Sequence, residues 1–240
     1  MLAALLLTLL ARPASAFETP DAQCAAEAER QERQMGIPSR LLKAISIVES
    51  GRYDRERRES YSWPWTVNAQ GKGHFFPTKA AAITFVQELK AKGIHSMDVG
   101  CMQVNLKYHP NAFANLEEAF EPRANVAYAA RFLKGLYDST KVWPVAASYY
   151  HSQTPSLAEA YRKRLMAAWD VERQRQDGHV VPASVMAENL RRFEANRESY
   201  QIRTVAEREE ARRIADAYRQ ARLAEWHLRK LQQQMAAQKS

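Results

Sequence analysis

The stretch LLKAISIVESG, residues 41–51, is an apolar run that ends on one carboxylate, that of Glu49. Its apolar side chains recur at helical spacing, which predicts a buried helix; they are Leu41, Leu42, Ile45 and Val48. We expect Ser39 to cap the start of this helix and Gly51 to close its end in a left-handed conformation. Glu49 then lies in the last turn, beside the negative end of the helix dipole.

This position predicts an unusual protonation state for Glu49. Burial and the helix dipole both disfavour the ionised carboxylate, so both should raise its pKa. A carboxyl group that keeps its proton near neutral pH is what general acid catalysis requires. The alternative is an ordinary glutamate at a helix end whose carboxylate reaches water. The stretch alone does not decide between the two.

Composition indicates a mainly α protein with a basic, Arg-rich surface, which suits an anionic partner but is favoured here as a merely solvated surface. The chain has 240 residues, enough for one domain and an appendage, and 46% of them are hydrophobic, enough for a core. Eight glycines interrupt a sequence rich in Ala, Arg, Glu and Gln, which favours helices. The net charge of +8 suits nucleic acid, a membrane surface or an acidic cell-wall polymer. Because the basic residues are spread widely and no recognition motif is present, we do not expect nucleic acid as the partner.

Residues 1–16 are similar to a secretory signal peptide. An apolar run, residues 1–10, is too short to span a bilayer and precedes the small residues Ala14, Ser15 and Ala16. Cleavage is expected after Ala16, although the positively charged segment that usually opens such peptides is missing. Since no other stretch has the length and apolar character of a membrane span, we expect an exported protein, periplasmic or secreted.

An oxidising compartment gives the two cysteines a meaning. Cys24 and Cys101 form an even set, so one disulfide is expected between them, with two buried thiols as the alternative. The six histidines are scattered without the spacing of metal ligands. We therefore expect neither a metal nor another cofactor.

Caps and chain breakers divide the rest of the chain into short elements. Further helices are predicted over residues 21–34, 78–92, 115–120, 123–138, 144–150 and 156–173. One β-hairpin is predicted over residues 63–76, whereas residues 52–59 are expected to form a charged loop. The domain should span residues 21–176. Residues 177–240 should form a charged helical tail, whose short Ala-rich heptads suit a single helix as well as a coiled coil.

Three motifs between the predicted helices carry a family resemblance. They are Glu49-Ser50-Gly51, GCMQVN at residues 100–105 and ASYYH at residues 147–151. In this order they resemble the SLT-type lytic transglycosylases, glycoside hydrolase family 23, which share the goose-type lysozyme fold. The resemblance covers about residues 24–169 and implies a lysozyme-like α-rich domain with one small β-hairpin and a C-terminal helical extension. The hairpin and the segment SMDVG, residues 96–100, are similar to the small wall-lysing enzymes of secretion systems and flagella.

The resemblance implies roles for single residues. Glu49 would protonate the glycosidic oxygen between N-acetylmuramic acid and N-acetylglucosamine in peptidoglycan glycan strands. It would then take the proton of the muramic C6 hydroxyl, which closes a 1,6-anhydro ring without water. Tyr150 would support this acid and the reacting sugar. Residues expected to bind the sugars are Ser50, Met102, Gln103, Asn105, His151 and Asp98; for Ser50, ordering of the helix end is the alternative.

The sequence departs from the family at two positions. Cys101 stands where the family has Leu, which is compatible with a disulfide that faces away from the substrate. His151 stands where the family has Asn, so the hydrogen bonding at this position is expected to differ.

The number of carboxylates separates the candidate reactions. Ordinary glycosidases use two, about 5–5.5 Å apart for retention and about 6.5–9.5 Å for inversion. A transglycosylase of this type needs one, because the acetamido group of the substrate can assist and its own hydroxyl replaces water. Asp54, Glu56 and Glu59 lie among arginines and should form ion pairs, which leaves Asp98 as the candidate second carboxylate.

Two alternatives therefore stay open. One is a hydrolytic muramidase on the same fold, with Asp98 as the base. The other is an inactive wall-binding or assembly factor, whose basic tail recruits a secretion or flagellar assembly.

Overall fold

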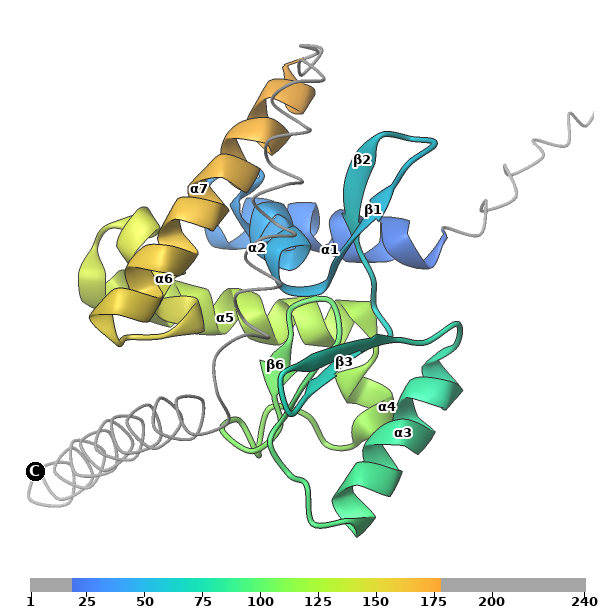
Figure 1. The fold of residues 1–240 in the computed structure, drawn as a ribbon. Coiled ribbons are helices and arrows are strands. Elements are labelled where there is room, and N and C mark those ends of the chain that lie inside the picture. The colour runs from blue at the N-terminus through green and yellow to red at the C-terminus, as the bar shows by residue number, and fades with distance from the viewer. Residues whose placement is uncertain (1–18, 178–240) are drawn as a thin grey trace, which may run out of the picture.

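The computed structural model describes residues 19–177, and in them it shows seven helices and six short strands (Figure 1). The helices are α1 (Pro20–Met35), α2 (Leu41–Ser50), α3 (Lys79–Ala91), α4 (Leu116–Ala119), α5 (Pro122–Thr140), α6 (Trp143–His151) and α7 (Pro155–Gln176). The strands are β1 (Gly51–Asp54), β2 (Glu59–Ser62), β3 (Thr66–Ala69), β4 (Lys72–Phe75), β5 (Met97–Val99) and β6 (Val104–Asn105). The predicted mainly α class is confirmed, with every predicted helix of the domain present. The predicted signal peptide, residues 1–16, and the predicted tail from residue 178 onward lie outside the described residues.

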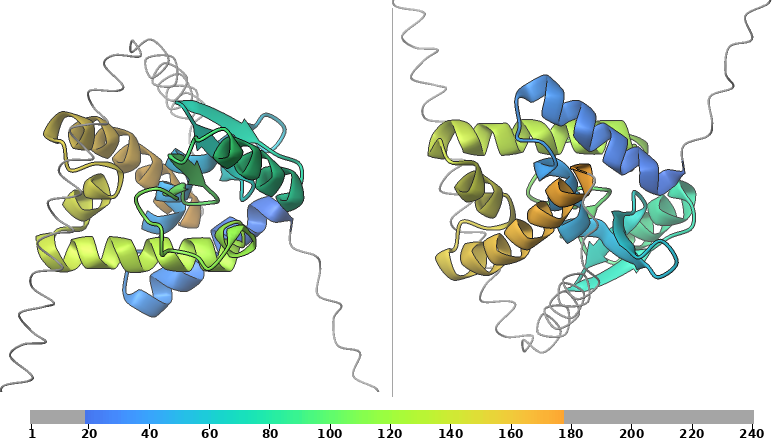
Figure 2. Two further views of the ribbon diagram at one scale, coloured as in Figure 1. Left: turned by 90° about the horizontal axis from the view of Figure 1, so that it is seen from below. Right: turned by 90° about the horizontal axis from the view of Figure 1, so that it is seen from above.

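The helix that carries Glu49 lies inside the bundle. Figure 2 shows α2 between α1 and α7, with α5 running beside them. Its start is capped differently from the prediction, because Ser39 has no capping bond and donates its hydroxyl to Gln176 instead. The carboxylate of Glu32 on α1 caps the helix, accepting the backbone N–H of Arg40 and Leu42, each at 2.8 Å. An anion at a helix N-terminus satisfies these amides and interacts favourably with the dipole.

The end of α2 also differs from the prediction. Gly51 is extended, at φ −67° and ψ 142°, rather than left-handed, so the chain passes directly from helix into strand β1. A Cβ atom at Gly51 would lie 2.0 Å from the carbonyl oxygen of Ile47, which excludes any larger residue there. Glycine is therefore required by close backbone approach and not by its conformational freedom.

The sheet content is larger than predicted. The expected charged loop at residues 52–59 forms strands β1 and β2, which pair antiparallel from Gly51 opposite Ser62 to Asp54 opposite Glu59. The predicted hairpin is confirmed as β3 and β4, and it belongs to a four-stranded sheet in the order β4-β3-β5-β6. The single hairpin expected from the sequence is thus replaced by two small antiparallel sheets. Strands β1 and β2 form because they pair with each other, although their local composition does not favour strands.

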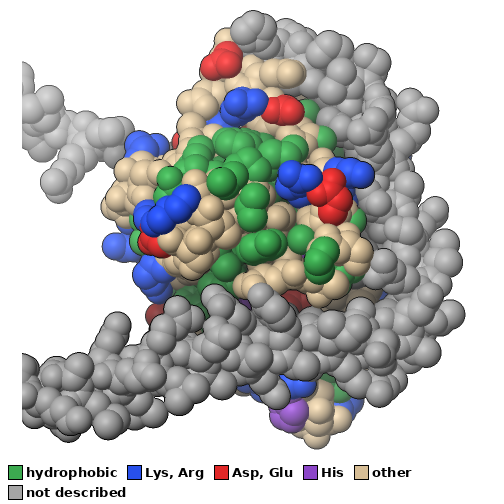
Figure 3. All heavy atoms as spheres, turned by 90° about the vertical axis from the view of Figure 1, so that its left-hand side faces the viewer, with side chains coloured by type: hydrophobic (Ala, Val, Ile, Leu, Met, Phe, Trp, Pro, Cys, Tyr) green, Lys and Arg blue, Asp and Glu red, His purple; other side chains and the backbone are tan. Residues whose placement is uncertain are grey.

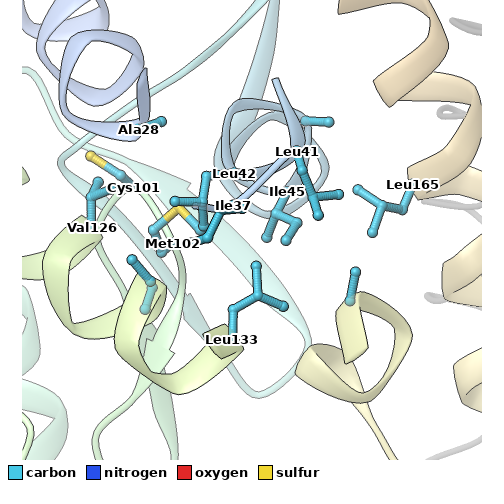
Figure 4. Packing of buried hydrophobic residues seen from close by; sticks show 14 of the residues in the cluster. Ala28, Ile37, Leu41, Leu42, Ile45, Cys101, Met102, Val126, Leu133 and Leu165 are labelled. Atoms are coloured by element: carbon cyan, nitrogen blue, oxygen red, sulfur yellow. The ribbon is translucent and has the colours of Figure 1, made fainter. Parts of the chain in front are cut away.

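Two buried clusters hold the domain together. The first joins the helices α1, α2, α5, α6 and α7, and Figure 4 shows Leu41 and Ile45 of α2 pointing toward Leu133 and Leu165. The second lies between the four-stranded sheet and α3, with Val67 and Val86 fully buried. Burying a large aliphatic side chain contributes about 1.5–3 kcal/mol.

The predicted disulfide is present. Cys24 of α1 is bonded to Cys101, with Cα atoms 5.7 Å apart, and both side chains are fully buried. The bridge joins α1 to the loop between β5 and β6. It therefore fixes the segment that carries the second sequence motif.

One apolar side chain is conspicuous on the outer surface. Val142 is 48% exposed at the junction of α5 and α6, and beside it the rings of Tyr137 and Trp143 stack at 4.0 Å. Figure 3 views this side of the molecule and shows apolar side chains gathered there, with Lys and Arg at the margin. Among residues 19–177, no helix combines the length and apolar character that crossing a bilayer would need.

Candidate active site

Glu49 lies in the last turn of α2, as the sequence predicts, and its carboxylate is partly buried. Burial raises its pKa to about 7, and the negative charge of Asp98 acts in the same direction. The hydrogen bond from Tyr161 and the positive charge of Arg164 oppose this rise. Glu49 therefore holds its proton near neutral pH, with burial as the main cause.

Tyr161 of α7 is the direct partner of this acid. Its hydroxyl donates to Oε1 of Glu49 at 2.7 Å, and its own side chain is 1% exposed. The imidazole of His151 stacks on the Tyr161 ring at 4.7 Å and 3°, and the guanidinium of Arg164 lies 5.6 Å from the ring centre. Burial, followed by the charge of Glu49, raises the pKa of Tyr161 well above its usual value. The phenol thus stays a donor and fixes the orientation of Glu49.

Tyr150, predicted to support the acid, makes a different hydrogen bond. Its hydroxyl donates to the carbonyl oxygen of Met102 at 2.8 Å, and its ring packs on Phe132 at 5.6 Å. Glu49 lies within electrostatic reach, because its charge helps burial to raise the pKa of Tyr150. Tyr150 therefore positions the second motif, and Tyr161 supplies the hydrogen bond that the sequence assigned to Tyr150.

The second motif is a tight loop built around one buried amide. The side chain of Asn125 accepts the N–H of Met102 at 2.9 Å and donates to the carbonyls of Val99 and Ala119 at 3.0 and 2.9 Å. Gly100 has a φ of +83°, and a Cβ atom there would lie 2.3 Å from the Asn125 nitrogen. Since both conditions exclude other residues, this glycine and this asparagine set the loop together.

Gln103 projects from this loop in a strained conformation. Its φ is +46°, uncommon for a residue other than glycine. Its side-chain nitrogen donates to the carbonyls of Gly100 and Thr66 at 2.9 and 3.2 Å, whereas Oε1 is buried without a hydrogen-bond partner among residues 19–177. This amide therefore supports the loop from inside, and its acceptor oxygen is not exposed to a ligand.

Asp98 and Asn105 face each other across strands β5 and β6. Nδ2 of Asn105 donates to Asp98 at 2.7 Å, and Oδ1 of Asn105 accepts the backbone N–H of Lys107 at 3.0 Å. Because the Asp98 charge contributes to the raised pKa of Glu49, this pair lies within electrostatic reach of the acid. The structure thus brings both predicted residues to the same region.

Two predicted substrate-binding residues are instead buried supports. Ser50 is 1% exposed and its hydroxyl donates to the carbonyl of Cys101 at 2.7 Å. Met102 is fully buried in the core. Neither side chain presents a surface to a ligand, so the predicted sugar-binding roles of these two residues are wrong. Ser50 orders the helix end, the alternative considered for it above.

The three motifs converge through these bonds. The Ser50 hydroxyl joins the first motif to the second, and the Tyr150 hydroxyl joins the third to the second. The stack of His151 on Tyr161 then connects the third motif to Glu49. The three motifs thus form one connected region around the Glu49 carboxyl group.

A separate hollow lies on another part of the surface. A surface hollow of about 520 Å³ lies between α3 and α4, but none of the predicted site residues lines it. In the same part of the chain, no group of three His, Cys, Asp or Glu side chains could hold a metal ion.

Replacing Glu49 by glutamine is expected to change the pH dependence of stability. The folded-state pKa of about 7 exceeds the reference value of 4.5, so the folded parent loses stability as pH rises from 4.5 to 7. Glutamine carries no such charge. The melting temperature of E49Q should match that of the parent near pH 4.5 and exceed it increasingly toward pH 8.

Thermal unfolding monitored between pH 4.5 and 8 tests this. E56Q, altered at an exposed glutamate in the β1–β2 turn, is the control and should show no widening difference. A constant offset between E49Q and the parent would show that Glu49 is ionised in the folded protein.

No protein-family model, no curated protein and no solved structure matches this chain.

Proposed function

We propose that this protein is a peptidoglycan lytic transglycosylase built on a lysozyme-like domain. The observation that carries the proposal is the carboxyl group of Glu49, partly buried, hydrogen-bonded by Tyr161 and with a pKa of about 7. Its position among the three motifs of the SLT-type enzymes gives that acid a substrate class. The mainly α fold is compatible with the lysozyme-like assignment.

The reaction follows from one group that acts twice. Protonated Glu49 donates its proton to the glycosidic oxygen, and the bond between C1 of N-acetylmuramic acid and that oxygen breaks. The resulting carboxylate then accepts the proton of the muramic C6 hydroxyl as O6 bonds to C1. Glu49 ends protonated again, and the strand is cut without consuming water. A pKa near the working pH is the value at which one group serves best as acid and then as base.

The presence of a second carboxylate, Asp98, near Glu49 favours the alternative function, a hydrolytic muramidase. Asp98 lies within electrostatic reach of Glu49, and Asn105 orients it. However, one oxygen of the Asp98 carboxylate already accepts the Asn105 amide at 2.7 Å, so this side chain is held by its neighbour in the sheet. We therefore assign Asp98 to shaping the field around Glu49.

The products of sacculus digestion separate the two reactions. We expect mass spectrometry to find muropeptides that end in 1,6-anhydro-N-acetylmuramic acid, about 18 mass units lighter than hydrolysis products because no water is added. Reducing-end muramic acid as the main product would instead establish the muramidase. Heat-denatured protein provides the baseline.

The remaining elements of the proposal concern place and partners. Residues 1–16 would direct export, and the glycan strands would be met in the periplasm or outside the cell. Residues 177–240 would contact a secretion or flagellar assembly. The rival assembly factor would localise in the same way but would release no muropeptide.

A further inference from the structure

The two-stranded sheet carries a second feature close to Glu49. The guanidinium carbon of Arg52 lies 5.4 Å from the ring centre of Trp63, 5.3 Å from that of Phe75 and 6.0 Å from that of Tyr61. We call these four residues the Arg52 cluster. One cation over three aromatic rings is more than the isolated contacts that protein surfaces usually show.

The cation of this cluster has no carboxylate partner among residues 19–177. Arg52 is exposed and forms no ion pair in this part of the chain, whereas Arg57 of the same hairpin pairs with both Asp21 and Asp54. Stacking over rings uses the face of a guanidinium and leaves the N–H donors at its edge available. Arg52 thus lies against three rings while its charge remains unneutralised among the described residues.

The cluster is tied by hydrogen bonds to the end of α2 that carries Glu49. The backbone N–H of Trp63 donates to the carbonyl of Ser50 at 3.2 Å, which ties the Trp63 main chain to the last turn of α2. The indole N–H donates to the carbonyl of Phe76 at 2.7 Å, and the ring packs edge-on against Trp65 at 5.4 Å. Arg52 itself lies three residues after Glu49, directly across the strand pair from Tyr61.

We infer that the Arg52 cluster binds a carboxylate of the peptide stem that peptidoglycan carries on its muramic acid residues. The inference rests on the proposed function and assigns a specificity to the same site. Among the groups of a glycan strand, stem carboxylates are the anions that an edge-on guanidinium binds best, with two parallel hydrogen bonds. The rings supply an apolar floor for the aliphatic part of the stem.

A peptide stem extends well beyond the sugar that carries it. A stem of four residues extends up to roughly 14 Å from its muramic acid. In the proposed reaction the muramic acid at the cleavage point would meet Glu49, and Arg52 lies three residues farther along the chain, in β1. The acid and the cluster therefore read two parts of one repeating unit, and stem-bearing strands become the preferred substrate.

The stem contact can be tested by measuring cleavage of two substrates, glycan strands that carry stems and strands stripped of stems by an amidase. The proteins compared are the parent, R52Q and R55Q. Arg55 is an exposed arginine in the turn of the same hairpin, so R55Q removes the same charge without touching the rings. We expect R52Q to lower kcat/KM on stem-bearing strands about fivefold, the size of an exposed charge-assisted bidentate contact. On stripped strands R52Q should equal the parent, and R55Q should equal the parent on both.

Binding of the same strands to E49Q and to the double variant E49Q/R52Q gives a readout that needs no catalysis. We expect E49Q/R52Q to bind stem-bearing strands about fivefold more weakly than E49Q does, as measured by co-sedimentation. On stripped strands the two variants should bind equally. If the parent releases no product and this binding difference persists, the proposed reaction fails and the stem contact stands. If the parent cleaves but R52Q loses nothing, or loses equally on stripped strands, the stem contact is overturned.

Discussion

E49Q is expected to cleave glycan strands about a thousandfold more slowly than the parent. Glutamine keeps the size of the side chain and still accepts the Tyr161 hydroxyl, but it has no proton to give to the glycosidic oxygen. It also cannot take the proton of the C6 hydroxyl, so both halves of the reaction are affected. Release of soluble muropeptides from purified sacculi measures the rate.

The matched control is again E56Q, whose exposed side chain lies in the β1–β2 turn. It should release muropeptides at the parental rate. Melting temperatures near pH 4.5, where E49Q and the parent should agree, show that the folded state is intact. Wall clearance by E49Q as fast as by the parent would defeat every mechanism based on this carboxyl group, including the muramidase.

The position and the raised pKa of Glu49 could be predicted from the sequence. Apolar spacing placed it in a buried last turn, and burial does raise its pKa. The bond that orients it could not be predicted. Tyr161 lies 112 residues after Glu49 in the sequence. The apolar residues around it predict that it lies on the inner face of α7, but they do not identify its hydrogen-bond partner. A buried tyrosine must find an acceptor for its hydroxyl, but the sequence does not say which one.

Errors at the ends of α2 have the same physical origin. Ser39 and Gly51 are locally suited to cap a helix, yet Glu32 supplies the start and a close backbone approach dictates Gly51. The strands at 51–54 and 59–62 could not be predicted because a run of charged residues, 55–58, separates them, and their stability comes from each other and from α2. Local preference identifies candidates for a cap or strand, and tertiary contacts choose among them.

The disulfide shows how much of the site depends on a distant contact. Removing it in a C24A/C101A variant is expected to lower the free energy of unfolding by about 4 kcal/mol, the loop-closure value for a link between residues this far apart. The bridge spans 77 residues of sequence, so the unfolded chain gains much freedom when it is lost. The melting temperature should fall by roughly 10 °C.

Activity should fall with stability, because the bridge anchors the loop on which the site is built. The carbonyl of Cys101 accepts the Ser50 hydroxyl, and that of the next residue accepts the Tyr150 hydroxyl. Reducing agent should lower the melting temperature of the parent toward that of the variant and leave the variant unchanged. An oxidised parent and a variant that melt together would show that the helices alone fix this loop. The second motif is hydrogen-bonded to Ser50, the residue after Glu49. C24A/C101A should therefore release muropeptides more slowly than a surface variant that is destabilised to the same extent.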